Sequence, residues 1–298
     1  MKKNILLIAS AAVILMSCNS SNETNKNTEK EKAVISESLP NADIMPGADD
    51  AMSTFSLSVS EGKRLIAKGI AAHPRIKQKM ESGMIIITKG TTNAYIAEEL
   101  IGLTAEHGQF MSGNISNKPF KIKVNTIPEI IVINGKWVDM PLKDALEAVK
   151  QDDIILKGGN LLNYEKRQAA ATVSSPEGGT VGRIRPYTAE GPGHLIVPIG
   201  LEKETYGNLS DYEYILSQDN FKFIGSRQRV MVHKNAEIFT EIEAIKLFGN
   251  VKVIPFASGG IAGSEGASSL VIYGSQQEVD KVMNIISTIK GEPPFIED

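Results

Sequence analysis

The stretch MIIITKGTTN, residues 84–93, indicates which class of fold this chain adopts. Its first half is a short apolar run rich in β-branched residues, which is typical of a strand buried on both faces of a sheet. Gly90 then permits a tight turn, and Thr91, Thr92 and Asn93 are residues that cap the start of a helix. The stretch therefore predicts a strand, a turn and a helix in succession, as in α/β proteins.

The same pattern recurs along the chain. Further apolar runs predict strands at 55–59, 130–133, 154–156 and 195–199. Helices are predicted at 60–80, with Pro74 able to bend or divide it, at 94–100 and at 141–150. Strands that alternate with helices require crossover connections, so we expect an α/β fold of three layers around a mostly parallel sheet.

The chain from about Glu237 shows a different order of elements. Its periodicity predicts a helix at 237–248, a strand at 251–257, a glycine-rich loop at 258–266, a strand at 268–273 and an amphipathic helix at 276–289. This order predicts a small C-terminal α+β domain of ferredoxin-like character. We therefore expect an α/β domain over 55–236 and the smaller domain over 237–298.

The N-terminus carries a pattern that is typical of export. Lys2 and Lys3 precede an apolar run over 5–16, which is too short for an ordinary membrane-spanning helix. We interpret residues 1–17 as a signal peptide. The alternative is a chance apolar start in front of a buried structural cysteine, Cys18.

The apolar run ends in Leu15-Met16-Ser17-Cys18, which resembles the bacterial lipobox. In that family the peptidase cuts before the cysteine, so the resemblance implies that Cys18 is thioether-linked to diacylglycerol and carries a further acyl chain such as palmitate. Several acyl tails give stable membrane anchoring. Cys18 is the only cysteine, so it forms no disulfide within the chain. We expect a lipoprotein of the bacterial cell envelope. Asn19 is not the aspartate that resembles an inner-membrane retention signal, which favours the outer membrane.

Residues 18–54 are predicted to form a disordered tether between the lipid and the folded body. Residues 19–32 include no apolar side chain, so they cannot bury enough surface to offset the entropy of ordering. A folded polar arm is the alternative. The net charge of −3 argues against a nucleic-acid partner held by bulk electrostatics. No later stretch is apolar enough to span a bilayer, so attachment to the membrane is expected to depend on Cys18 alone.

Several glycine turns together resemble the superfold shared by ribose-5-phosphate isomerase, glucosamine-6-phosphate deaminase and the CoA transferases. They are Lys157-Gly158-Gly159-Asn160, Glu177-Gly178-Gly179-Thr180 and the strand and turn at 195–203. In that group a strand leads into a phosphate loop and a helix, and Lys89-Gly90-Thr91-Thr92-Asn93 stands in that place here. The likeness covers about residues 60–205 and is one of order and loop type.

The chain departs from the isomerase pattern where the chemistry is done. Lys157 and Asn160 stand in place of the acidic residues that an isomerase needs as general acid and base, so isomerase activity is not implied. A CoA transferase needs a glutamate nucleophile, for which Glu177 is the best candidate; a solvent-facing turn residue is the alternative. His194 is a second catalytic candidate, as an acid or base facing the same pocket, or else a structural residue.

The loops predict a site for an anion. Open α/β sheets bind ligands beyond the carboxyl ends of their strands, and a helix N-terminus attracts negative charge. The predicted ligand-binding residues are Lys89, Gly90, Thr91, Thr92, Asn93, Lys157, Gly158 and Gly159. Further cations at or after predicted strand ends are Arg183, Arg185 and Lys203, with ordinary surface cations as the alternative reading.

No cofactor or metal is predicted, because the sequence has no phosphate loop of the P-loop type, no His-Glu-x-x-His and no cysteine cluster. Two functions remain open. The first is a lipid-anchored envelope protein whose α/β body binds an anionic small molecule, a phosphate or a carboxylate, with or without catalysis. The second is a non-catalytic envelope protein that serves assembly or partner binding, for which a homo-oligomer is a natural form.

Overall fold

A computed structural model of the protein describes residues 44–111, 126–225 and 227–295. By its internal contacts the chain divides into Met1–Met45 and Pro46–Asp298, and every helix and strand named below lies in the second unit. Cys18, the predicted signal peptide and most of the predicted tether lie outside the described residues. Over the ranges that are described, no helix is both long and apolar enough to cross a membrane.

The largest sheet has six strands and mixed direction. In spatial order they are β10 (Ala236–Phe239), β8 (His194–Pro198), β5 (Ile154–Leu156), β2 (Met84–Ile87), β3 (Ile130–Ile133) and β4 (Lys136–Val138). The first four run parallel, whereas β3 is antiparallel to β2, and β4 to β3. Asn134 and Gly135, with φ of 48° and 77°, form the tight turn that folds β3 back as β4. The predicted α/β class is confirmed, in a mixed sheet.

The apolar run at 84–87 is buried within this sheet. Ile85, Ile86 and Ile87 have no exposed surface, and β2 pairs with β5 on one side and β3 on the other. A strand that is covered on both faces has no polar face to present, which is why its sequence lacks the alternation of a half-buried strand. The strands predicted at 130–133, 154–156 and 195–199 also form, the last starting at His194.

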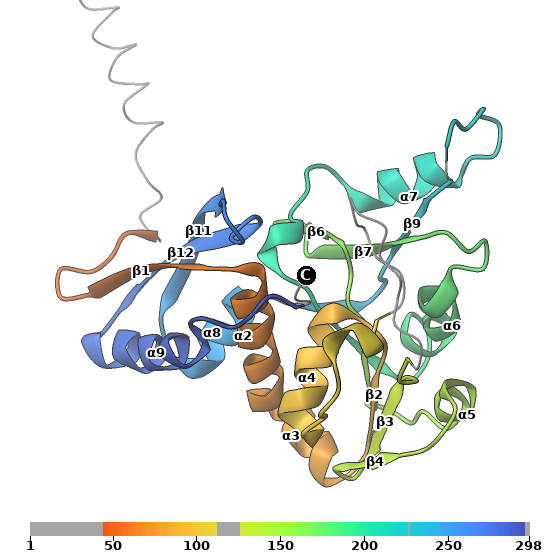
Figure 1. Cartoon of the computed structure of the whole chain (residues 1–298), viewed down its shortest axis with the longest axis horizontal. Coiled ribbons are helices and arrows are strands. Elements are labelled where there is room, and N and C mark those ends of the chain that lie inside the picture. Colours follow the sequence, from red (N-terminus) through yellow and green to blue (C-terminus); the bar gives the residue numbers. More distant parts are fainter. Residues whose placement is uncertain (1–43, 112–125, 226, 296–298) are drawn as a thin grey trace, which may run out of the picture. The chain divides into compact units, whose positions relative to one another are not determined.

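The helices largely follow the predicted order. They are α2 (Val59–Ala72), α3 (Pro74–Glu81), α4 (Thr91–Ile101), α5 (Leu142–Glu147), α6 (Gly179–Thr188), α7 (Leu209–Ser217), α8 (Glu241–Phe248) and α9 (Gln276–Ile289), with short 3-10 helices η2 (His107–Gln109) and η3 (Leu201–Lys203). The helix predicted at 60–80 is divided before Pro74, because proline lacks the N–H that would continue it. Helix α2 packs against α4 and α8 (Figure 1).

The helix predicted at 237–248 is wrong over its first residues, because β10 ends at Phe239 and α8 begins only at Glu241. Thr240 caps α8: its Oγ1 accepts a hydrogen bond from the Ile242 N–H at 3.1 Å, and Glu243 accepts one from the Thr240 N–H at 2.9 Å. Because β10 belongs to the six-stranded sheet, the boundary predicted at 237 does not separate two independent sheets.

Two smaller antiparallel sheets complete the fold. One has the order β6 (Leu161–Asn163), β7 (Gln168–Val173) and β9 (Arg229–Val232). The other has the order β1 (Ala51–Leu57), β12 (Ala267–Gly274) and β11 (Lys252–Gly259), so the first strand of the body pairs with one near its end (Figure 1). Residues 51–54 were predicted to belong to the tether, and they lie in β1 instead. Their partner strand is remote in sequence, so no local pattern reveals the pairing.

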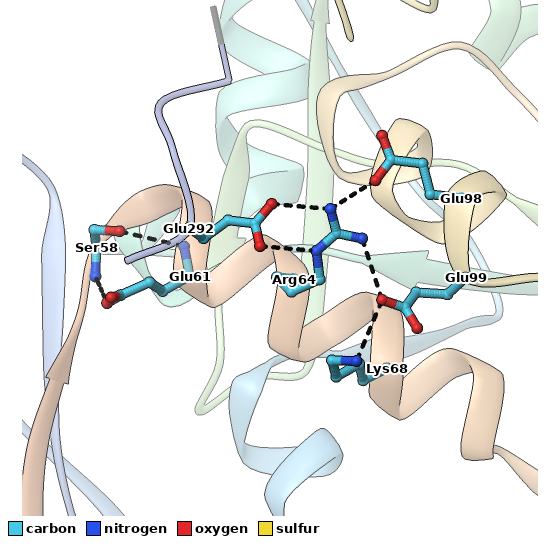
Figure 2. A network of polar contacts seen from close by, with 7 residues as sticks. All are labelled: Ser58, Glu61, Arg64, Lys68, Glu98, Glu99 and Glu292. Carbon is cyan, nitrogen blue, oxygen red and sulfur yellow. Dashed lines mark hydrogen bonds and ion pairs between the residues drawn. The ribbon is translucent and has the colours of Figure 1, made fainter. Parts of the chain in front are cut away.

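Arg64 on α2 joins three segments that are distant in sequence (Figure 2). Its guanidinium donates to Glu98 at 2.6 Å and to Glu99 at 3.1 Å, both on α4, and to Glu292, after α9, at 2.9 Å. The Arg64 side chain is 15% exposed, so these charge-assisted bonds are partly shielded from water. They hold α2, α4 and the end of the chain together.

Candidate functional site

The parallel strands of the six-stranded sheet end along one side, which we call the carboxyl edge. The register places Ile87 beside Leu156, and Phe239 beside Pro198. Residues that follow these strands are therefore brought close to one another. Since β3 runs in the opposite direction, Glu129 lies at the same edge, just before the first residue of that strand.

The two predicted ligand-binding loops meet at this edge. Residues 89–93 follow β2, and residues 157–159 follow the neighbouring strand β5. Asn93 connects them, because its Nδ2 donates to the Thr88 carbonyl at 2.7 Å and to the Leu156 carbonyl at 3.1 Å. The Asn93 side chain is buried, and its Oδ1 has no hydrogen-bond partner within the described part of the chain. A buried acceptor without a partner is rare in folded proteins and marks a place where a ligand group or water can donate.

The start of α4 differs from the prediction. The helix begins at Thr91 and its N-cap is Gly90, which supplies no side-chain cap. The three polar residues after Gly90 therefore lie in the first turn rather than before it. Lys89 extends toward Thr126, with 3.4 Å between Nζ and Oγ1. A helix start without a capping side chain leaves its first amides without a side-chain partner, and anion binding at this loop stays a prediction.

Three lysine side chains from separate elements interact electrostatically at the carboxyl edge, with Lys203 acting on each of the other two. They are Lys157 after β5, Lys203 in η3 and Lys63 in α2, and together with Glu202 and Glu241 we call them the carboxyl-edge cluster. Lys203 Nζ lies 3.2 Å from Glu202 Oε1. Lys157 Nζ donates to the carbonyl of Gly158 at 3.1 Å.

The lysines of the cluster are buried or half-buried and lie close to like charge. Burial and then the charge of Lys203 lower the pKa of Lys63 to about 8, against the attraction of Glu202 and Glu241. Burial and then Lys203 also lower the pKa of Lys157 to about 8, against the attraction of Glu129. Both ammonium groups therefore lose protons more readily than an ordinary lysine, and both gain stability from a bound anion.

Glu241 is the buried acid of the cluster, with 2% of its surface exposed. Its Oε2 accepts a hydrogen bond from the Leu201 N–H at 3.0 Å. A Cβ atom on Gly62 would lie 2.6 Å from Glu241 Oε1, so the absence of a side chain at that position of α2 leaves room for the carboxyl group. Burial and then the charge of Glu202 raise the pKa of Glu241 above its ordinary value, which favours the protonated acid.

His233 lies behind Lys157 and stays neutral. It follows β9 and is 6% exposed, and neither ring nitrogen has a hydrogen-bond partner of good geometry among the residues described. Burial and then the charge of Lys157 lower the pKa of His233 to about 3, although the backbone of Gly158 opposes the shift. This imidazole adds no charge to the cluster.

No family model, curated protein or solved structure matches this chain.

His194 does not face the carboxyl edge, and the expectation that it shares a pocket with the glycine loops is wrong. It is the first residue of β8, so it lies at the opposite, amino edge of the parallel strands. There its Nε2 is 2.7 Å from Glu237 Oε2, and His73 Nε2 is 2.9 Å from Glu237 Oε1. The run of β8 separates the two edges, because a strand advances about 3.3 Å with each residue.

Glu177 lies in an exposed turn before α6. Its carboxylate accepts a hydrogen bond from Ser175 at 2.6 Å, which holds the pKa of Glu177 below its ordinary value. Among the described residues, none of the carboxyl-edge cluster bonds to it. Arg183 and Arg185 lie on α6 rather than after a strand of the main sheet, and they pair at 3.6 Å with Glu129 and Glu213 respectively.

A polar cavity of about 480 Å³ lies apart from the predicted site, between β1, β11, β12 and the end of α9. Its lining includes Ser56, Ser269, Glu61 and Lys290. These groups already satisfy one another: the two serines are 2.6 Å apart, and Lys290 lies 3.2 Å from Glu61. The carboxyl edge, where the buried Asn93 Oδ1 has no partner among the described residues, is therefore the better candidate for a functional site. Within the described ranges, no group of three or more His, Cys, Asp or Glu side chains is arranged to hold a metal ion.

The sequence analysis missed Lys63, Glu241 and His233 as site residues. Glu241 was overlooked because β10 was read as the start of a helix, although Thr240 and Glu243 form a capping-box signature that places the helix start. No sequence pattern around Lys63 or His233 indicates a site. Each comes close to the other site residues only through contacts with elements that are distant in sequence.

Proposed function

We propose that this protein is a lipid-anchored envelope protein whose α/β body binds an anionic small molecule at the carboxyl-edge cluster. The observation that carries the proposal is the balance of charge in the cluster. Lys63, Lys157 and Lys203 are set against Glu202 and Glu129, while burial raises the pKa of Glu241 and favours its neutral form, so cations are in excess. A phosphate or carboxylate would supply the missing negative charge.

The polar groups around the cluster support a ligand that also carries a hydrogen-bond donor. Asn93 Oδ1 is a buried acceptor without a partner in the described part of the chain, and it lies between the two loops. A hydroxyl group on the ligand would satisfy it. The start of α4 beside this position suits the acid group. A hydroxylated phosphate or carboxylate therefore fits better than a bare inorganic ion.

The likeness to the isomerase, deaminase and CoA-transferase superfold belongs to the same proposal, as do the three-layer arrangement and the ferredoxin-like character of the C-terminal elements. The order of strands and loops over about 60–205 supports it. Catalysis by Glu177 is not part of the proposal, because the exposed turn offers that carboxylate no desolvated site. The lipid anchor is supported by the lipobox-like sequence at Cys18.

Thermal unfolding of the full-length chain in detergent, titrated with inorganic phosphate and separately with glycolate, tests the proposal. A saturable rise in the unfolding midpoint is expected, because a ligand at a hundredfold its dissociation constant adds about 2.7 kcal/mol. Lys203→Met and Lys157→Met should each weaken binding about tenfold or more. Lys252→Met is the matched control, since that lysine is exposed on β11, and should bind as the unchanged chain does.

Two results would overturn the proposal. One is the lack of a saturable shift with either anion. The other is binding that survives both cluster substitutions in variants whose circular dichroism shows an intact fold. Either result would favour the alternative, a non-catalytic protein of envelope assembly.

A further inference from the structure

Lys63, like Lys157, is shielded from water but takes part in no ion pair among the described residues. It is 8% exposed, and over the described residues no carboxylate lies within ion-pair distance of its Nζ. Its ammonium instead lies over the Phe295 ring, 5.5 Å from the centroid. The partly shielded Lys68 and Lys79, by contrast, pair with Glu99 and Asp153, and the exposed Lys290 pairs with Glu61.

A buried lysine without an ion pair is costly, because the ammonium loses its water and gains no opposite charge in return. Such lysines are rare unless the group has a use. Lys203, the nearby cation, adds to the cost of holding the proton on Lys63, and the pKa of Lys63 is lowered to about 8 by burial and by this charge. A desolvated amine beside another cation is one of the ways in which proteins prepare lysine as a nucleophile.

The groups around Lys63 match the needs of an amine that attacks a carbonyl group. Glu241 is a buried carboxyl group whose Oε1 lies against Gly62, the residue that precedes Lys63 on α2. Lys203 and Lys157 are cations that can hold an acid group of the same molecule. Nucleophile, acid and anion-holding groups thus come from α2, α8, η3 and the loop after β5.

We propose that Lys63 condenses with the carbonyl group of an anionic aldehyde or ketone, with Glu241 as the proton donor and Lys203 and Lys157 holding the acid group of that molecule. This inference rests on the proposed anion site and names the class of compound that the site takes. The substrate is an oxo acid or an oxo phosphate.

The condensation balances without any redox partner. Lys63 first gives a proton to solvent, and its Nζ lone pair then attacks the carbonyl carbon to form the C–N bond. The carbonyl oxygen takes the proton of Glu241 and becomes the hydroxyl group of a carbinolamine. The nitrogen returns a proton to Glu241, and the same acid protonates the hydroxyl group as the C–O bond breaks. Water leaves and an iminium remains on Lys63, and its hydrolysis reverses each step.

Reductive trapping on the full-length chain tests this inference. The probe is glyoxylate, a small anionic aldehyde, with sodium cyanoborohydride to reduce the iminium, and the readout is peptide mapping by mass spectrometry. We expect a carboxymethyl group on Lys63, formed at least tenfold faster than on Lys68 of the same helix. Phosphate should slow the labelling of Lys63 and not that of Lys68. Acetaldehyde, which lacks the acid group, should show a much smaller preference for Lys63 than glyoxylate does.

Further variants separate a chemical role of the cluster from a structural one. Glu241→Gln keeps an acceptor for the Leu201 N–H and should slow the labelling of Lys63 about tenfold or more, since general acid catalysis commonly contributes that much. The labelling rate in the unchanged chain should rise with pH toward a plateau above about 8.

Lys63 labelled no faster than Lys68, or labelled equally by glyoxylate and acetaldehyde, would overturn the inference. Because these comparisons use the unchanged chain, they do not depend on any variant folding. Phosphate binding that persists while Lys63 stays unreactive would leave the proposed function standing. If neither phosphate binding nor labelling of Lys63 is observed, the proposed anion site itself is wrong.

Discussion

The proton positions in the His73–Glu237–His194 contact follow from single hydrogen bonds. His73 Nδ1 accepts the Arg75 N–H at 3.2 Å, so its ring proton is on Nε2, from which it donates to Glu237. Hydrogen bonds from His194 and then His73 lower the pKa of Glu237 to about 2, although partial burial opposes the shift. This contact joins the α2–α3 junction to β8 and β10 at the amino edge of the sheet.

Glu237→Gln should lower the free energy of unfolding at pH 7 by about 1–2 kcal/mol, a figure discounted because the Glu237 side chain is 30% exposed. The folded-state pKa of Glu237 lies below its ordinary value, so its stabilisation is present above about pH 4.5 and is lost as the pH falls toward about 2. Urea unfolding of the unchanged protein and of Glu237→Gln, at pH values from 7 to 2.5, measures how the difference in stability depends on pH.

Glu147→Gln is the control, since that side chain is 59% exposed and pairs with Lys143 on the same helix, and it should change stability by less than about 0.5 kcal/mol. Equal stability of Glu237→Gln and the unchanged chain at pH 7 would contradict a stabilising role for the Glu237 carboxylate. A difference in the free energy of unfolding that is as large at pH 2.5 as at pH 7 would contradict it as well.

At the scale of helices and strands, most elements follow from local pattern, and the failures have local causes too. Helix α9 forms over the range predicted for it, with Val279, Val282, Ile286 and Ile289 buried on its inner face. The helix predicted at 237–248 is too long at its start. Its apolar pattern continues from β10 across the N-cap Thr240 into α8, so residues 237–239 belong to a strand. Contacts between helices do not follow from local pattern. The Arg64 contacts, which join α2 to α4 and to Glu292, are an example.

Arg64→Met should destabilise the fold by about 3 kcal/mol. The change leaves Glu98, Glu99 and Glu292 close together without their shared cation, and removing one partner from a shielded ion pair costs that much. Arg64→Lys should recover part of the loss, because a single ammonium cannot bond several carboxylates in the same geometry. Urea unfolding at pH 7 gives these differences.

Arg75→Met serves as the reference substitution, because that side chain is 52% exposed and lies 3.8 Å from Asp152. A loss for Arg64→Met no larger than that for Arg75→Met would show that the contacts in Figure 2 contribute little to stability.

At the scale of the whole molecule, segments from the two ends of the folded body contact each other. The register of β1 with β12 places Phe55 opposite Leu270, and Glu292 reaches back to α2. By its contacts the body begins at Pro46, and its first strand starts at Ala51. Lipidation at Cys18, as we propose it, would attach the chain to a membrane.

Cys18→Ser should abolish incorporation of labelled palmitate and release the chain from the membrane fraction when it is expressed in a bacterium that carries the lipoprotein pathway. The reason is that a thioether needs the cysteine sulfur, and stable attachment needs more than one acyl chain. Ser20→Ala, two residues later, should leave labelling and fractionation unchanged. A Cys18→Ser chain that still takes up palmitate would refute the lipobox interpretation.

The sequence by itself determined the α/β class, the strands at 84–87 and 154–156, the division of a helix at Pro74 and the two loops with Lys89 and Lys157. Each depends on residues within a few positions of one another, through periodicity, branching at Cβ, turn glycines and proline. Whether Cys18 is lipidated remains a prediction of the same local kind.

Only the tertiary structure decided which charged groups share the carboxyl edge. Lys63, Lys157, Lys203 and Glu241 lie on separate elements, and the order and direction of the strands bring them together. The same directions send His194 to the opposite edge. Strand order depends on contacts between distant segments, so the energy that places Lys63 beside Lys203 is absent from the neighbourhood of either residue in the sequence.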